Sequence, residues 1–212
     1  MKNIFLLFAL FLVGFNSIAQ TLSDPVAKSI LDDVSTATDA LEVIHIDFEF
    51  TLSNTTENIS ESSSGTLTIK NNQYLLSFMG LRQISDGETI WTILEEDEEV
   101  QISDIDPEDD EALSPSNLLK MYEKGFTYQL GEKSGNLQII DLLPENTDEV
   151  DYTKIELLID TKVKQVKNLK QFGENGTDSE YTIHTFSPLI IQDSAFTFNE
   201  ADYSGFDIID LR

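Results

Sequence analysis

The sequence contains no cysteine, only two histidines and few basic residues. Among its 212 residues, 39 Asp and Glu outweigh 13 Lys and Arg, which gives a formal net charge of −26. Without cysteine the chain forms no disulfide and has no cysteine to carry a lipid anchor, so its stability must come from burial. The acidic balance argues against binding nucleic acids and against adsorption to anionic bilayers, because both depend on Lys and Arg.

Motifs for catalysis and metal binding are also lacking. His45 and His184 lie far apart in the sequence, and there is no nucleophile elbow, Walker loop or dinucleotide fingerprint. The acidic residues 104–111 do not match a calcium-binding EF-hand, because Asp109 and Pro115 stand where that loop needs Gly and Glu. With 39 acidic residues some pair of carboxylates is always close, so a glycosidase-like pair carries no information. The sequence therefore favours a binding protein over an enzyme, without metal or cofactor.

The N-terminal residues have the pattern of a secretory signal peptide. Lys2 supplies a positive charge, residues 4–14 form an almost unbroken apolar run, and Ser17 and Ala19 are small residues where a signal peptidase cuts. The run is too short to span a bilayer, although a membrane anchor is the alternative interpretation. We therefore predict a signal peptide over residues 1–19 and a single exported domain over residues 20–212.

Two helices are predicted. Asp24 as N-cap and Pro25 in the first turn begin a helix over residues 24–40, whose apolar residues fall on one stripe. Ser114 and Pro115 begin a second, shorter helix that ends near Gly125. Its apolar residues are Leu118, Leu119, Met121 and Tyr122. A short apolar helix inserted between strands must lie against a sheet, because it cannot continue one.

Alternating apolar and polar residues predict a mainly β protein. Residues 44–52 alternate throughout, which is typical of a strand with one wet face. The Asp86-Gly87 turn is predicted to join a strand at residues 74–78 to the strand that holds Trp91. The serine-rich residues 54–64 are predicted to form a polar loop, and further strands follow as far as residues 195–198 and 206–211. The result is an antiparallel meander of about eleven strands.

A sheet of this size tends to curl or close, and the two helices can cover its concave side. Packed tightly, they make an ordinary solid core. Packed loosely, they leave an apolar cavity under a lid. The residue pattern alone leaves both interpretations open.

Several short patterns resemble the periplasmic outer-membrane lipoprotein carrier (LolA) family. In chain order they are Ile30-Leu31-x-x-Val34, Phe48 with Phe50, Gly65-Thr66-Leu67-Thr68-Ile69-Lys70, Ser85-Asp86-Gly87-Glu88-Thr89-Ile90-Trp91, Ser114-Pro115 with Leu118-Leu119, and Phe196-Thr197-Phe198 before a closing strand. The Ser-Asp-Gly-x-Thr-x-Trp piece is the most specific. The resemblance extends from the first helix to the C-terminus and implies an unclosed antiparallel β-barrel with a helical lid, in the periplasm.

The resemblance also implies a function. In that family a cavity takes up the acyl chains of a lipoprotein released by an inner-membrane ABC transporter, and the carrier brings it to an outer-membrane acceptor. We therefore expect a monomeric carrier whose partners are acylated lipoproteins, that transporter and that acceptor. The residues expected to line the lipid-binding cavity are Phe48, Phe50, Leu67, Ile69, Tyr74, Ile90 and Trp91. Those expected in the lid are Leu118, Leu119, Met121 and Tyr122.

One departure from the family concerns the lid. The better-known branch carries an arginine directly after the strand that ends here at Lys70, and that arginine helps to hold the lid shut. In this chain the position is Asn71. Closure is therefore expected to be weaker or to use another residue, such as Lys70 or Arg82.

Five lysines lie close together in the sequence: Lys154, Lys162, Lys164, Lys167 and Lys170. On so acidic a chain they are a candidate surface for docking a transporter or lipid headgroups, and the alternative is a solvated strand face. Other functions remain open as well. They are a binding module for another lipid or amphiphile, a secreted enzyme with a carboxylate site, and a structural surface protein.

Overall fold

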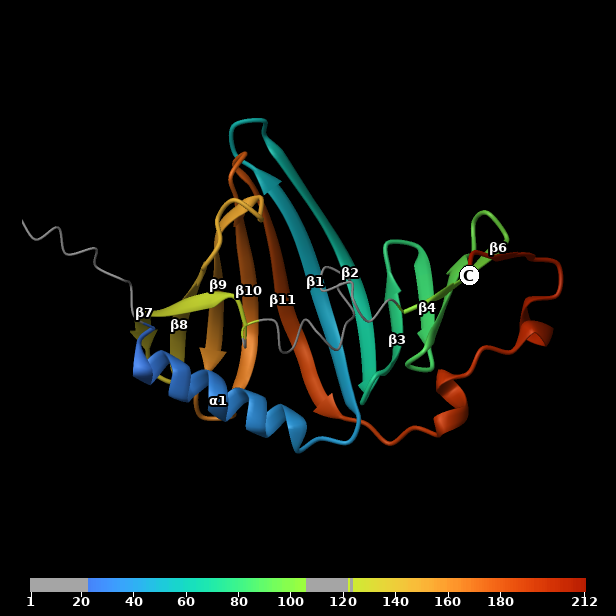
Figure 1. The fold of residues 1–212 in the computed structure, drawn as a ribbon, viewed down its shortest axis with the longest axis horizontal. Helices are drawn as coiled ribbons and strands as arrows, with labels where there is room; N and C mark the ends of the chain where they lie inside the picture. The colour runs from blue at the N-terminus through green and yellow to red at the C-terminus, as the bar shows by residue number, and fades with distance from the viewer. Residues whose placement is uncertain (1–22, 106–121, 123) are drawn as a thin grey trace, which may run out of the picture.

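The computed structural model describes residues 23–105, 122 and 124–212, and its described part is dominated by one large curved sheet (Figure 1). The elements are α1 (Pro25–Asp39), β1 (Ile44–Asn54), β2 (Ile59–Lys70), β3 (Gln73–Phe78), β4 (Leu81–Ser85), β5 (Thr89–Leu94), β6 (Glu99–Asp104), β7 (Phe126–Ser134), β8 (Leu137–Pro144), β9 (Tyr152–Asp160), β10 (Gln165–Gly173), β11 (Thr177–Pro188), the 3-10 helices η2 (Asp193–Phe196) and η3 (Glu200–Tyr203), and β12 (Asp207–Asp210). Among these residues no helix has the length and apolar character needed to cross a membrane. The expected signal peptide lies outside the described residues.

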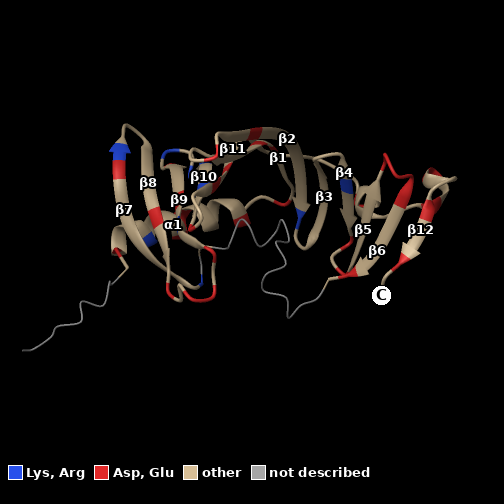
Figure 2. Ribbon diagram, turned by 90° about the horizontal axis from the view of Figure 1, so that it is seen from above, with Lys and Arg blue, Asp and Glu red and all other residues tan. Residues whose placement is uncertain are grey.

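The strands form one 12-stranded sheet in the order β12-β6-β5-β4-β3-β2-β1-β11-β10-β9-β8-β7. Neighbouring strands run antiparallel, except that β12 runs parallel to β6. The two ends of the order, β7 and β12, do not meet, and the sheet bends into an arch with α1 on its concave side (Figure 2). The prediction of a mainly β, unclosed antiparallel barrel is therefore confirmed, with one parallel strand added at the edge.

Helix α1 begins where the sequence predicts. The Asp24 carboxylate accepts hydrogen bonds from the backbone N–H groups of Val26 at 2.7 Å and Ala27 at 3.2 Å, so it caps donors that the helix itself leaves unpaired. The apolar stripe of the helix packs against residues of β7 to β10, the strands beside which α1 lies in Figure 1. The buried residues of this α1 core are Ala27, Leu31, Val34, Tyr122, Ile140, Leu142, Ile155, Leu157 and Ile159.

The predicted polar loop at residues 54–64 is wrong for most of its length. Strand β2 begins at Ile59 and pairs with β1 residue by residue. Thr51 and Ser62 lie opposite each other, and their hydroxyl oxygens are 2.9 Å apart. The serines are poor strand formers, but a long partner strand supplies their backbone hydrogen bonds, so tertiary pairing overrides local propensity.

Two other element predictions are corrected. Strand β4 lies between β3 and β5, so the Asp86-Gly87 turn follows β4 and not residues 74–78. The turn from β3 into β4 uses Met79 and Gly80, both with positive φ (51° and 79°), a conformation that tight hairpins need but that a methionine does not signal. The predicted strand at residues 195–198 is wrong. Its first two residues belong to η2, where Phe196 is fully buried, and the next two lie in no strand.

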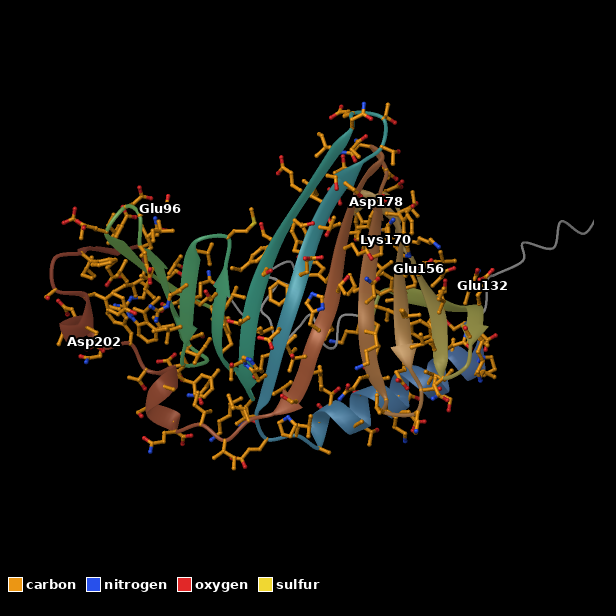
Figure 3. All side chains as sticks on the ribbon, turned by 180° about the vertical axis from the view of Figure 1, so that it is seen from behind. Glu96, Glu132, Glu156, Lys170, Asp178 and Asp202 are labelled. Carbon is orange, nitrogen blue, oxygen red and sulfur yellow. The ribbon has the colours of Figure 1, made fainter. Side chains whose placement is uncertain are left out.

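The concave face of the sheet can be followed through directly paired residues, which point to the same side. One such row consists of Phe50, Tyr181, Leu169, Leu157 and Ile140. It ends in the α1 core, so Phe50 shares the concave side with α1. The neighbouring row on the convex side is polar and consists of Thr51, Glu180, Lys170, Glu156 and Asp141. Figure 3 views the sheet from its convex side, with Glu156, Lys170 and Asp178 on neighbouring strands.

In strands β4 to β6 the buried residues change sides. Ile84, Ile93 and Val100 are buried on the convex side, where Phe198, Tyr203 and Phe206 pack against them. These aromatic residues belong to the C-terminal segment, which we define as residues 189–206. An ion pair between Lys70 and Asp193, at 2.6 Å, fastens this segment to the end of β2. The sheet therefore has separate apolar clusters on its two faces.

Candidate functional site

Four aromatic rings meet at the centre of the concave face. We call Phe48, Phe50, Phe78 and Tyr181 the aromatic patch, and its ring centroids are separated by 5.4 Å (Phe48–Phe78), 6.0 Å (Phe48–Tyr181), 5.7 Å (Phe50–Phe78) and 5.0 Å (Phe50–Tyr181). Phe48 is 8% exposed. The other three rings are partly exposed. They come from β1, β3 and β11, which the sheet brings together at its centre.

Further apolar side chains, most of them aliphatic, extend this surface. We call the whole cluster the central apolar face; besides the aromatic patch it contains Ile44, Ile46, Leu67, Ile69, Tyr74, Leu41, Leu76, Ile90, Ile183 and Phe186. Several members are only partly buried, and α1 packs on the neighbouring strands β7 to β10 instead. The centre of the arch thus presents apolar surface to which an apolar ligand could bind.

A glycine shapes the floor of the aromatic patch. Gly65 on β2 lies directly opposite Phe48 on β1. A Cβ atom at Gly65 would lie only 2.3 Å from Cζ of Phe48, so the phenylalanine ring occupies the space that any other residue would need. The glycine therefore allows the ring to lie close to the sheet.

The structure brings together six of the seven residues predicted to line a cavity: Phe48, Phe50, Leu67, Ile69, Tyr74 and Ile90. Trp91 is the exception, and its inclusion is corrected. Consecutive residues of a strand point to opposite faces, so Ile90 and Trp91 cannot line the same surface. Trp91 lies on the convex side, where its ring stacks on Phe198 with centroids 5.7 Å apart and planes inclined by 11°.

Of the four predicted lid residues, Leu118, Leu119 and Met121 lie outside the described residues. Tyr122 is 4% exposed and belongs to the α1 core. Its hydroxyl donates to the carbonyl oxygen of Leu31 at 3.4 Å, and its own carbonyl accepts from the Tyr128 hydroxyl at 2.6 Å. Tyr122 is thus fixed against α1 and not over the central apolar face.

A cavity of about 430 Å³ lies beside this tyrosine. Its lining consists of Lys28, Leu31, Asp32, Ser35, Thr36, Tyr122 and Tyr128. The lining mixes polar and apolar groups and belongs to α1, β7 and Tyr122, so the cavity is separate from the central apolar face. Apart from Tyr122, none of the residues that line this cavity was predicted from the sequence to belong to a site.

A chain of hydrogen bonds borders the central apolar face. The Tyr74 hydroxyl donates to Oε1 of Gln83 at 3.3 Å, and Nε2 of Gln83 donates to the Thr92 hydroxyl at 3.1 Å. Burial raises the pKa of Tyr74 to about 12, so its hydroxyl stays neutral and able to donate at physiological pH. Sequence reasoning missed Gln83 and Thr92, because polar residues in a sheet usually mark its solvated side.

The five clustered lysines do not form one free basic surface. Lys154 contacts Asp141 at 2.9 Å and Glu156 at 3.1 Å, Lys170 contacts Asp178 at 3.1 Å, and Lys164 contacts Asp33 at 3.1 Å. Nζ of Lys167 donates to Gln165 at 3.0 Å, and Lys162 is exposed in the turn after β9. Lys154 and Lys170 also lie over the ring of Phe172, at 4.6 and 4.7 Å from its centroid. Three of the five positive charges are therefore compensated by neighbouring carboxylates.

The residues considered for lid closure have other partners. Lys70 binds Asp193, as described above, and also contacts Glu42 at 3.4 Å. Arg82 contacts Glu95 at 3.0 Å. Asn71 lies in the turn between β2 and β3 with a φ of 53°, a left-handed conformation that asparagine adopts more readily than arginine. The turn itself thus accounts for asparagine at this position.

The described residues contain no group of three or more His, Asp or Glu side chains able to hold a metal ion. Nδ1 of His45 lies 3.0 Å from the Thr68 hydroxyl, and its Nε2 lies 3.2 Å from Asp47. His184 is exposed.

Solved structures with similar folds come from several bacteria. They include an uncharacterized conserved protein from Thermus thermophilus (TM-score 0.54, 12% identity, covering 87% of this chain and 99% of that one). A LolA superfamily protein from Nitrosomonas europaea has a TM-score of 0.44 at 10% identity and covers 81% of this chain and 97% of its own. Lipoprotein LppX from Mycobacterium tuberculosis has a TM-score of 0.47 at 13% identity and covers 80% and 100%.

The structural neighbours thus include a LolA superfamily protein, the family that the sequence patterns resemble. At these identities the likeness concerns the fold alone, and of the three matches only the one to the Thermus protein exceeds a TM-score of 0.5. No family model and no curated protein matches the chain.

Proposed function

We propose that this protein is a periplasmic carrier that holds the acyl chains of a lipoprotein on its central apolar face. The observation that carries the proposal is the partly exposed aromatic patch at the centre of the concave side, surrounded by aliphatic side chains. In this proposal an inner-membrane ABC transporter loads the carrier and an outer-membrane acceptor unloads it. The protein acts without a cofactor and as a monomer.

The energetics of the task agree with such a surface. Each buried methylene contributes about 0.8 kcal/mol, so one long acyl chain carries on the order of 10 kcal/mol of hydrophobic free energy. A carrier must match much of this and still release its cargo. For the acyl chains an apolar face does so, because the hydrophobic effect is not directional and fixes the chains in no single position.

A transfer assay tests the proposal. Vesicles that contain a fluorescent triacylated lipopeptide are incubated with the protein and then pelleted, and the lipopeptide that remains in the supernatant is measured. Native mass spectrometry of detergent-free protein gives the mass of any lipid that co-purifies. Retention of the lipopeptide in solution by wild-type protein is the expected result, and failure of both measurements to find an acylated ligand would overturn the proposal.

Two neighbouring residues of β3 provide a matched pair of variants. Phe78 belongs to the aromatic patch, whereas Ser77 is exposed and pairs with Arg82, so it faces the other side. Phe78→Asp places a carboxylate where an acyl chain would remove its water, which should reduce transfer about tenfold or more. Ser77→Asp adds the same charge on the convex side and should leave transfer unchanged.

Circular dichroism establishes that each variant folds. Should Phe78→Asp prove unfolded, Leu76→Gln tests the same face two residues earlier on the strand. Transfer at the wild-type level by a folded Phe78→Asp or Leu76→Gln protein would show that the cargo binds elsewhere.

A further inference from the structure

One row of paired residues on the concave face changes from apolar to polar. The row crosses six strands, from β1 to β6, and consists of Ile46, Leu67, Leu76, Gln83, Thr92 and Gln101. Directly paired residues point to the same side, so all six side chains border the same concave surface. The first three belong to the central apolar face. We call the last three, Gln83, Thr92 and Gln101, the polar row.

The polar row keeps hydrogen-bonding groups that its internal contacts do not use. Gln83 accepts one hydrogen bond from Tyr74 and donates one to Thr92, which leaves it a second amide N–H. Nε2 of Gln101 donates to Glu99 at 2.6 Å, which leaves the side-chain carbonyl of Gln101. All three side chains of the polar row are partly exposed. A ligand that reaches beyond the apolar face would therefore meet donors and acceptors.

The charges around the polar row have one sign. Strands β1 to β6 contain only two lysine or arginine residues, Lys70 and Arg82, and the alternation of side chains places both on the convex side. On the concave side of these strands the charged side chains are Glu99, two residues from Gln101 on β6, and Glu61, which lies six residues along β2 from Leu67 and so away from the polar row. The low dielectric of the neighbouring apolar face strengthens the repulsion between Glu99 and a negative charge.

We propose that the polar row binds the polar part of the same amphiphile whose acyl chains lie on the central apolar face, and that it selects uncharged groups rich in amides or hydroxyls over anionic ones. This inference rests on the proposed function and specifies its ligand class. An acylated peptide carries its first backbone amides next to the acyl chains, so it offers the required chemistry. A phospholipid with an anionic headgroup does not.

Two probes with the same tail isolate the head. N-lauroylglycinamide ends in an amide and N-lauroylglycine in a carboxylate, and both are titrated into the wild-type protein by calorimetry at pH 8, below their critical micelle concentrations. The amide should bind about tenfold more tightly or better, because the carboxylate must lose water beside Glu99 without a positive partner.

A double variant locates the source of this preference. Thr92→Val with Gln101→Leu removes two polar groups at nearly constant volume, and the amide should then bind about five- to tenfold more weakly. Binding of the carboxylate should change less than about twofold. The matched control is Gln73→Leu, which removes an amide from the convex side of β3 and should keep the wild-type preference.

The possible failures are distinguishable. If neither probe binds the wild-type protein, the proposed carrier function fails and this inference fails with it. If both bind equally well, the carrier function stands and the selectivity is wrong. If the preference survives unchanged in a folded Thr92→Val/Gln101→Leu protein, the polar row is not its source and the assignment is overturned.

Discussion

Replacing Gly65 by alanine tests how tightly the aromatic patch is packed. The new Cβ would lie 2.3 Å from Cζ and 2.8 and 2.9 Å from the two adjacent ring carbons of Phe48, far inside the optimal separation of about 3.5–4.0 Å. The ring must therefore move. It is 8% exposed and contacts the rings of Phe78 and Tyr181, so these neighbours must move with it.

The expected loss of stability follows from two opposing effects. Overpacking of a well-packed cluster costs about 1–3 kcal/mol. Replacing glycine by alanine also restricts the unfolded chain, which returns about 0.5–1 kcal/mol. The free energy of unfolding should fall by about 1–2 kcal/mol, and for a chain of this size the melting temperature falls by about 2–4 °C for each kcal/mol.

Urea unfolding followed by circular dichroism measures this loss, and a double-mutant cycle identifies its cause. Phe48→Leu shortens the side chain and makes room for the new methyl group. In that background Gly65→Ala should cost little, which gives a coupling energy of about 1 kcal/mol or more. Ser64→Ala, at the exposed neighbouring position, should stay within about 0.5 kcal/mol of wild type. Losses that add within about 0.5 kcal/mol would refute the steric explanation.

Two further predictions concern other aromatic residues. Burial raises the pKa of Tyr74 to about 12, from 10 in the unfolded chain. The stability that its neutral hydroxyl contributes is therefore complete below pH 10 and is lost as the pH rises toward 12. Between pH 9 and 11 the wild-type free energy of unfolding, measured by urea titration, should fall by about 1 kcal/mol more than that of Tyr74→Phe, and equal falls would contradict the burial of this hydroxyl. Phe198→Ala should uncover the single tryptophan, Trp91, and shift its fluorescence to longer wavelength. The free energy of unfolding should fall by about 1–3 kcal/mol. An unchanged fluorescence spectrum would contradict the stacking of the two rings on the convex side.

The sequence predicts those parts of the fold that local rules determine. The cap at Asp24 sets the start of α1, and the alternation in residues 44–52 indicates β1 and its apolar side. The Asp86-Gly87 turn also forms where predicted, although its preceding strand is β4. In each case the signal and the structure lie within a few residues of each other.

Other parts depend on partners far along the chain. The serines of β2 become a strand only because β1 pairs with them, and β12 joins β6 in parallel after a long connection.

The candidate site shows the same division between residues that a local pattern predicts and residues that depend on distant partners. The apolar residues of alternate positions could be predicted, but Trp91 was misplaced because the apolar side of the sheet changes from concave to convex at β4. Nothing in a local pattern reports which side a distant segment will cover.

The position of β1 at the centre of the sheet has a consequence for the order of folding. Its first partner, β2, follows directly, but its second, β11, comes much later, and Asn54 meets Thr177 across 123 positions of sequence. Until residues 177–188 arrive, one edge of β1 has no partner, and the apolar side chains of the strand remain uncovered. Such distant pairing slows folding, and an open edge invites pairing with other chains. Between the emergence of β1 and that of β11, the unpaired edge of β1 is therefore open to pairing with other chains.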